Sequence, residues 1–279
     1  MNLVKRHPLV AYFGIAYAAS AVGLAVIGFP RLGPGGTTNP ASLAIFPVLI
    51  LSVAAASIGL TALTLGRAGL SELWSRMRRF RLDPRLYLVL LVPPASVVIT
   101  LTVLKLTVSP SFAPGWQLFG LPIGLVAGFF EEIGWTGFAY PRMRARFGAV
   151  AGAVLLGLLW GIWHMPVIDS LGAASPHGAA WPAYFAAFVV LVTAIRCLIA
   201  WAYERTGSVL LAQLIHASFT GTLILFSAAH VTPGQEATWY FAYAGLMWLG
   251  LLAATLATRR FIPLAVPPRS ASARPTARE

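Results

Sequence analysis

Eight long apolar stretches, separated by short polar connections, constrain what this 279-residue chain can fold into. A stretch of about 20 apolar residues is long enough to cross a bilayer as a helix. Hydrophobic residues make up 58% of the chain and charged residues only 10%, whereas soluble domains carry about 25% charged residues. The sequence therefore predicts an all-α, polytopic transmembrane helix bundle of about eight spans. The expected spans are residues 9–29, 41–65, 86–108, 118–140, 147–167, 181–203, 208–229 and 237–257.

The basic residues gather in alternate connections between these stretches. Lys5 and Arg6 precede the first span, six arginines lie within residues 66–85, and further arginines follow the fourth, sixth and eighth spans. Positively charged loops stay on the cytoplasmic side, so we expect a multi-pass cell-membrane protein with both termini in the cytoplasm. This placement also accounts for the net charge of +12 without a nucleic-acid partner, which we do not expect.

We expect three regions, and the bounds of the middle one come from the motif resemblance described below. Residues 1–117 are expected to hold three spans and the basic cytoplasmic connection, residues 118–229 a core, and residues 230–279 the last span and a disordered basic tail. The basic connection reads either as an amphipathic helix on the membrane face or as a solvated loop, because Leu70, Leu73, Trp74 and Met77 recur at helical spacing. The pair of prolines at positions 93 and 94 is expected to kink or break the third span.

Ionisable residues inside the spans are the candidate functional residues. Glu131 and Glu132 lie in the fourth span, and His164, Arg196 and His216 lie in three later ones. One such histidine is ordinarily a satisfied core residue, but ionisable groups within a bilayer are costly, pair with one another and mark sites. Adjacent helical residues diverge by about 100°, so one glutamate can face the site while the other faces a neighbouring helix.

The helical spacing predicts which residues lie beside the two histidines. Trp160 shares a helical face with His164, and Thr220 shares one with His216. For Trp163 we expect a place in the interfacial aromatic belt, and for Gly128 and its neighbours at positions 134 and 137 ordinary close helix packing. A carboxylate in a low dielectric can act as a general base toward water, and a histidine can orient that water, bind a metal or stabilise an oxyanion. Hydrolysis by activated water is the predicted reaction class.

Three segments together resemble the motifs of the CPBP intramembrane proteases. They begin at Glu131 (EEIGWTGFAYPRM), Trp160 (WGIWHMP) and His216 (HASFT). That family includes the type II CAAX prenyl endopeptidases and bacterial abortive-infection and lysostaphin-resistance-like proteins. The resemblance covers residues 118–229 and implies an α-helical bundle with a hydrated cavity, in which a peptide bond of a membrane-associated peptide or protein is hydrolysed.

The resemblance also implies a role for each matching residue. Glu131 would activate the attacking water with help from His164, Glu132 would support the site, and His216 would stabilise the oxyanion. The family is described both as zinc-dependent and as purely glutamate-dependent. A zinc ion held by Glu131, His164 and His216 is therefore one expectation and a site without metal is the other.

Three departures from the family pattern are present, and the mildest is Trp160 in place of the Phe of the second motif. Thr136 stands where the first motif ordinarily has Arg, and Thr220 stands where the third has Asn or Asp. Arg196, if it faces inward, would take the place of the missing arginine, a hypothesis that charge-reversal exchange can test. The Ala-, Gly- and Arg-rich composition points to a bacterial source. The alternative function is a non-catalytic membrane protein on the same scaffold, serving bacteriocin immunity or proton-coupled transport.

Overall fold

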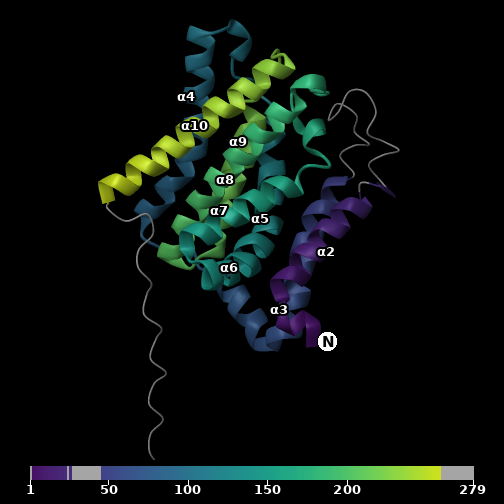
Figure 1. Cartoon of the computed structure of the whole chain (residues 1–279). Coiled ribbons are helices and arrows are strands. Elements are labelled where there is room, and N and C mark those ends of the chain that lie inside the picture. Colours follow the sequence, from purple (N-terminus) through teal and green to yellow (C-terminus); the bar gives the residue numbers. More distant parts are fainter. Residues whose placement is uncertain (1, 24, 27–44, 259–279) are drawn as a thin grey trace, which may run out of the picture.

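The fold is a bundle of helices that run back and forth between two ends (Figure 1). The structure is a computed structural model that describes residues 2–23, 25–26 and 45–258. Within these ranges all regular elements are helical, which confirms the all-α prediction. Four helical segments are long and apolar enough to cross a membrane, and they are Phe46–Met77, Pro84–Thr107, Gly178–Thr206 and Pro233–Leu256.

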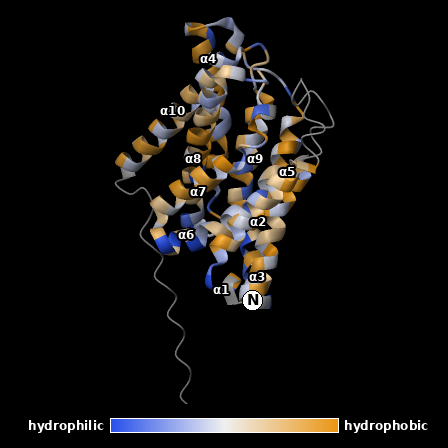
Figure 2. Ribbon diagram, turned by 45° about the vertical axis from the view of Figure 1, so that its right-hand side comes forward, coloured by the Kyte–Doolittle hydropathy of each residue, from blue (hydrophilic) through white to orange (hydrophobic). Residues whose placement is uncertain are grey.

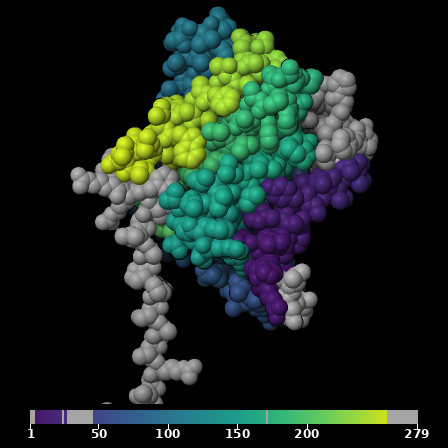
Figure 3. All heavy atoms as spheres, viewed as in Figure 1, coloured from purple at the N-terminus to yellow at the C-terminus, as the bar shows by residue number. Residues whose placement is uncertain are grey.

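Each of the eight expected spans contains a helix. The helices are α2 (Pro8–Gly23), α3 (Ile45–Met77), α4 (Val92–Thr107), α5 (Gly120–Gly134) with α6 (Tyr140–Phe147), α7 (Ala149–Trp163), α8 (Trp181–Thr206), α9 (Val209–Leu225) and α10 (Pro233–Thr258), and a short α1 (Asn2–Arg6) precedes them. Figure 3 shows α10 in yellow lying across the green helices, with α2 in purple against the lower part of the bundle. The expected turn at residues 30–40 and the expected tail beyond residue 258 lie outside the described residues.

The arginine-rich connections meet at one end of the bundle. Arg76 after the bend of α3 donates to the hydroxyl of Tyr203 at 2.8 Å, and Arg79 donates to the carbonyl of Thr206 at 2.9 Å. Arg144 of α6 forms an ion pair with Glu204 at 2.6 Å. Figure 2 shows the hydrophilic colouring concentrated around α6 at the lower end. The connections that follow α3, α6 and α8 therefore share one face, as alternate connections of a membrane bundle should.

The structure shows the conformation of two segments for which the sequence left alternatives, residues 66–77 and the prolines at 93 and 94. Residues 66–77 continue α3 as a helix beyond a bend at Gly66, whose φ of 63° is the left-handed conformation that glycine adopts readily. On this part Leu73 is buried and Trp74 is exposed. The segment is therefore a helix as far as Met77 and not a loop, while its place on a membrane face stays a prediction. The prolines at 93 and 94 occupy the first turn of α4 after a 3₁₀ segment, so the predicted break is confirmed.

Small residues bring α5 and α9 into backbone contact, and this contact positions the site. A Cβ added at Gly124 would lie 2.4 Å from the amide nitrogen of Gly221, and one added at Gly128 would lie 2.6 Å from the amide nitrogen of Ala217. Gly120 faces the same helix one turn earlier. Small residues spaced by four allow this approach in membrane bundles. The packing role expected for Gly128 is confirmed, and α9 is close enough to place its histidine beside the carboxylates of α5.

Candidate active site

Both glutamates are buried at the end of α5, next to an irregular turn. Glu131 is 4% exposed and Glu132 is fully buried. Directly after α5, residues Trp135–Ala139 form a π-helical turn before α6 begins. Turns of this kind change which side chains face a neighbouring helix and are frequent at functional sites. The two carboxylates point to different partners, as their angular separation predicts.

Glu132 is fully occupied by hydrogen-bond donors from two other helices and from its own. Arg196 of α8 donates through Nη1 to Oε2 at 2.8 Å and through Nη2 to Oε1 at 2.7 Å. His216 of α9 donates from Nδ1 to Oε1 at 2.8 Å, and the hydroxyl of Thr136 donates to Oε2. Each carboxylate oxygen thus accepts two hydrogen bonds. Both oxygens of Glu132 are thus engaged inside the bundle.

Arg196 faces inward and bonds to Glu132, as the hypothesis that it replaces the missing arginine requires, and the replacement itself stays a prediction. Its side chain is fully buried, and Nη1 also donates to the hydroxyl of Thr136 at 3.1 Å. A threonine offers one short hydroxyl, whereas a guanidinium offers a planar pair of donors that matches a carboxylate. In this chain α8 therefore supplies the cation from another helix, and Thr136 fills the remaining space between it and Glu132.

Glu131 is held differently, by two indoles on a single oxygen. Trp135 donates from Nε1 to Oε2 at 3.1 Å, and Trp160 of α7 donates from Nε1 to the same Oε2 at 2.9 Å. The other oxygen, Oε1, accepts no hydrogen bond from any described residue. Of the two carboxylates, Glu131 is the one that keeps an acceptor free.

The two histidines meet the glutamates at the indole of Trp160. The ring centroids of His216 and His164 lie 4.9 and 5.7 Å from that of Trp160, and Arg196 lies over the same ring at 4.6 Å. His164 is half-buried at the end of α7 and donates from Nδ1 to the carbonyl of Trp160 at 2.8 Å. The residues expected from separate spans are thus brought to one cluster, while Thr220 is half-buried and its hydroxyl has no hydrogen bond among the described residues.

The arrangement does not form a metal-ligand set. In the described ranges no group of three His, Cys, Asp or Glu side chains is placed to hold a metal ion. The Nδ1 atoms of His164 and His216 are engaged with Trp160 and Glu132, and Oε2 of Glu131 accepts two indole N–H groups. These contacts leave Nε2 of both rings and Oε1 of Glu131 without a hydrogen bond among the described residues, and zinc binding by these residues stays a prediction.

The sequence analysis placed Trp163 wrongly and did not single out Trp135. Trp163 is only 2% exposed, and its ring lies against Trp135 and His164 at centroid distances of 5.6 and 4.8 Å. The expected place in an interfacial belt is therefore wrong, because aromatic partners surround this indole inside the bundle. Trp135 was not singled out, although it directly contacts Glu131. Its spacing of four residues from Glu131 was the available signal.

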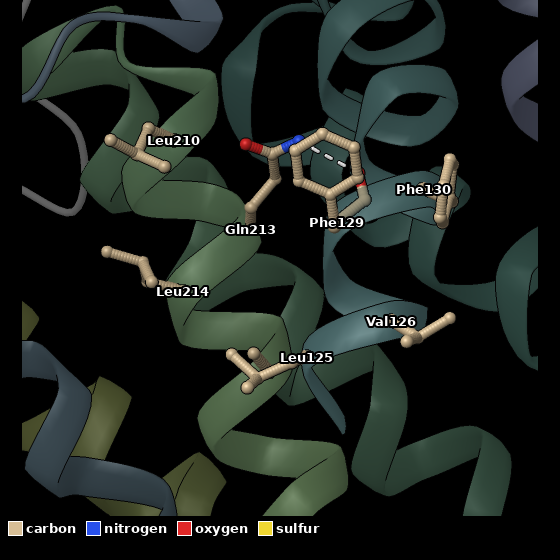
Figure 4. Close-up of a pocket in the computed structure, with 8 residues that line it drawn as sticks. Leu125, Val126, Phe129, Phe130, Leu210, Gln213 and Leu214 are labelled. Atoms are coloured by element: carbon tan, nitrogen blue, oxygen red, sulfur yellow. Dashed lines mark hydrogen bonds between the residues drawn. The ribbon is translucent and has the colours of Figure 1, made fainter. Parts of the chain in front are cut away.

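An apolar groove opens on the seam between α5 and α9 (Figure 4). It has a volume of about 310 Å³ and is lined by residues that include Leu125, Phe129 and Leu214. The one polar side chain shown there, Gln213, donates from Nε2 to the carbonyl of Phe129 at 2.8 Å. No ionisable group lines this groove, so the reacting groups lie on the other faces of α5 and α9.

Comparison with known proteins gives a match over this same region. Residues 113–222 match the family model described as type II CAAX prenyl endopeptidase Rce1-like. The chain is also similar to a CAAX prenyl protease 2 of Methanococcus maripaludis, with 28% identity over 96 residues. That alignment spans 33% of this chain and 35% of the relative. The family match contains all the clustered residues from Glu131 to His216.

Proposed function

We propose, on the premise that residues 113–222 belong to the Rce1-like family of CAAX prenyl endopeptidases, that this chain is a membrane-embedded endopeptidase using glutamate-activated water. The observation that carries the proposal is the unequal occupancy of the two buried carboxylates. Glu132 has both oxygens engaged, whereas Glu131 keeps Oε1 free. A general base must have an acceptor available within reach of the water proton.

The proposed hydrolysis uses the two acceptor atoms that are free of hydrogen bonds among the described residues, Oε1 of Glu131 and Nε2 of His164. Oε1 of Glu131 takes a proton from water as the water oxygen attacks the carbonyl carbon of the scissile peptide bond. Because Nδ1 of His164 donates to a carbonyl, a neutral His164 has an acceptor at Nε2 that can hold the second water proton. The proton on Glu131 then passes to the leaving amine as the C–N bond breaks, which restores the carboxylate.

His216 is placed to act on the other side of the reaction. Its Nδ1 donates to Glu132, so Nε2 can donate to the oxyanion only when the ring carries both protons. A donor fixed in advance at the developing charge lowers the barrier, because no reorganisation is needed during the reaction. In this scheme Glu132 and Arg196 hold His216 in place and take no proton themselves.

The substrate class we propose is a membrane-associated peptide or protein. The family of the matched region and the name of the archaeal relative make a prenylated CAAX peptide the first substrate to test. We further propose a multi-pass cell-membrane location with both termini in the cytoplasm. This orientation is supported by the gathering of the arginine-rich connections at one end of the bundle.

The test is cleavage by the purified protein in liposomes. A library of reporter peptides, with and without a prenylated cysteine, is incubated with the wild type and with Glu131→Ala, in the presence and absence of a chelator. We expect turnover by the wild type only, with or without chelator. Equal turnover by both proteins contradicts the protease assignment, and loss with chelator alone favours the metal-dependent alternative. Absence of cleavage by either protein favours the immunity or transport alternative.

A further inference from the structure

Two indole N–H groups converge on one carboxylate oxygen from different elements. Trp135 belongs to the π-helical turn and Trp160 to α7, and both side chains are essentially buried, at 0% and 1% exposure. Both donate to Oε2 of Glu131, at 3.1 and 2.9 Å. An indole is a donor only, so these contacts cannot reverse their direction. The pair forms what we call the indole clamp.

The clamp fixes a torsion that is otherwise soft. The terminal torsion of a glutamate side chain is broad and roughly two-fold, so an unrestrained carboxylate presents either oxygen in a range of directions. With two donors on Oε2, rotation of the group would break two charge-assisted hydrogen bonds. The clamp thereby designates Oε1 as the atom that faces the reacting water.

The first span supports one arm of the clamp. The ring of Tyr12 in α2 lies edge-on to Trp135 at 5.6 Å with an interplanar angle of 90°, and Phe13 stacks beside it at 6.3 Å. Tyr12 is fully buried, and its hydroxyl has no hydrogen-bond partner among the described residues. The ring therefore contributes by packing. Residues 8–23 lie outside the matched segment 113–222, so part of the support for Glu131 comes from outside the family region.

The second arm is supported from within the site. The indole of Trp160 contacts both the guanidinium of Arg196 and the ring of His216, at 4.6 and 4.9 Å from its own centroid. Both of those residues are bonded to Glu132. Trp160 is thus the element that connects the anchored carboxylate to the free one.

We propose that Trp135 and Trp160 are positioning residues that hold Oε2 of Glu131 and present Oε1 to water, and that α2 completes the arrangement by bracing Trp135 through Tyr12 and Phe13. This inference rests on the proposed hydrolytic function. It assigns the two indoles no contact with substrate, so their loss should change the rate of the chemical step and leave substrate binding in place.

The kinetic test uses Trp135→Phe and Trp160→Phe in liposomes. Each should lower kcat by about 10- to 100-fold, the size of effect that a small misplacement of a catalytic group produces, at an unchanged KM. Trp239→Phe is the matched control, because Trp239 is a fully buried tryptophan on α10 whose indole N–H has no partner, and it should keep the wild-type kcat. Tyr12→Ala should lower kcat, whereas Tyr12→Phe, which keeps the ring, should have the wild-type kcat.

A spectroscopic readout tests the clamp independently of activity. In protein labelled with ¹⁵N-tryptophan, Glu131→Gln should shift the indole N–H resonances of Trp135 and Trp160, because an amide oxygen is a weaker acceptor than a carboxylate. The resonance of Trp239 should stay in place. If the wild type cleaves no substrate but Glu131→Gln still shifts both indole resonances, the proposed function fails and the clamp stands. Unshifted Trp135 and Trp160 resonances, or folded Trp→Phe variants with the wild-type kcat, would overturn the clamp.

Discussion

Arg196 and Glu132 form a two-point ion pair that joins α8 to α5 entirely within the buried interior. The two N–O distances are 2.8 and 2.7 Å, and neither side chain has appreciable exposure. Ionisable residues within a membrane are ordinarily paired in this way because an isolated charge there is costly. The pair also fixes His216, which donates to the same carboxylate. The placement of Glu132 and His216 therefore depends on a contact between helices that are distant in sequence.

Removing one member of this pair should be more damaging than removing both. Arg196→Met leaves Glu132 buried without its cation, and breaking a buried pair from one side costs about 3–5 kcal/mol. Glu132→Gln combined with Arg196→Met should be closer to the wild type than the sum of the single variants. Thermal unfolding in detergent measures this coupling, and strictly additive losses would contradict it.

Charge exchange tests the same contact with the pairing retained. Glu132→Arg alone places two guanidinium groups together, and Arg196→Glu alone places two carboxylates together, so both single variants should be strongly destabilised. The double exchange restores opposite charges and should recover part of the thermal stability. A double variant no more stable than either single variant would show that Arg196 does not act on Glu132 as a pairing cation.

Much of the architecture could be predicted from the sequence because it follows from local composition. Apolar stretches of bilayer length predicted the helices. The positions of the arginines predicted that alternate connections meet at one end of the bundle. The bend at Gly66 and the break at the prolines also have local causes. The inward orientation of Arg196 was anticipated as a hypothesis, but the indole partners of Glu131 were not, since the contact of Trp160 with Glu131 spans 29 residues. Trp163 was placed wrongly for the same reason, because a tryptophan in the belt and one in the interior have similar sequence surroundings.

The contact between α5 and α9 should tolerate no added methyl group. Gly124→Ala places a Cβ 2.4 Å from the backbone of Gly221, and overpacking of this kind costs about 1–3 kcal/mol. It should also lower turnover, because moving α9 separates His216 from Glu132. Gly245→Ala on α10 is the control, since nothing lies within 4 Å of its added Cβ. Equal melting temperatures for the two variants would contradict close packing at this seam.

A second charged cluster ties the connection after α7 to α10. His177 bonds through Nδ1 to Asp169 at 2.6 Å and through Nε2 to Glu236 at 3.1 Å, and its ring stacks on Tyr184 at 3.8 Å. Glu236 also accepts two backbone N–H groups from this connection, including that of Ala174 at 2.6 Å. With a carboxylate on each nitrogen, the ring is best satisfied when it carries both protons.

This cluster predicts a stability that declines as the pH rises. Burial lowers the pKa of His177, but the hydrogen bonds and charges of Glu236 and Asp169 outweigh burial and raise the pKa above its ordinary value of 6.5. A raised folded-state pKa gives stability that is complete below the unfolded-state pKa and is lost as the pH rises through the folded-state pKa. The melting-temperature advantage of the wild type over His177→Gln should therefore be complete below about pH 6.5 and should shrink as the pH rises above it.

The matched control for this pH series is His230→Gln. His230 is exposed in the connection before α10, and its side chain makes no hydrogen bond, ion pair or ring contact with the described residues. Its replacement should leave the melting temperature unchanged at every pH. A constant difference between the wild type and His177→Gln across the series would mean that the protonated ring is not what holds the connection.

Membrane orientation can be checked with single cysteines. The native Cys197 is buried in α8, so Cys197→Ser gives a background without thiols. In intact cells a membrane-impermeant maleimide should label His230→Cys, which lies at the end opposite the arginines, and should spare Ser75→Cys in the basic connection. Both should be labelled once the cells are opened. The reverse pattern in intact cells would place the termini outside.

The division of labour between Glu131 and Glu132 is tested most directly by measuring turnover and thermal stability of Glu131→Gln and Glu132→Gln side by side in liposomes. The free oxygen of Glu131 and the occupied oxygens of Glu132 predict that Glu131→Gln keeps a near-wild-type melting temperature and loses hydrolysis. They predict that Glu132→Gln unfolds at a clearly lower temperature. Hydrolysis retained by Glu131→Gln at the wild-type rate would contradict the assignment of the base.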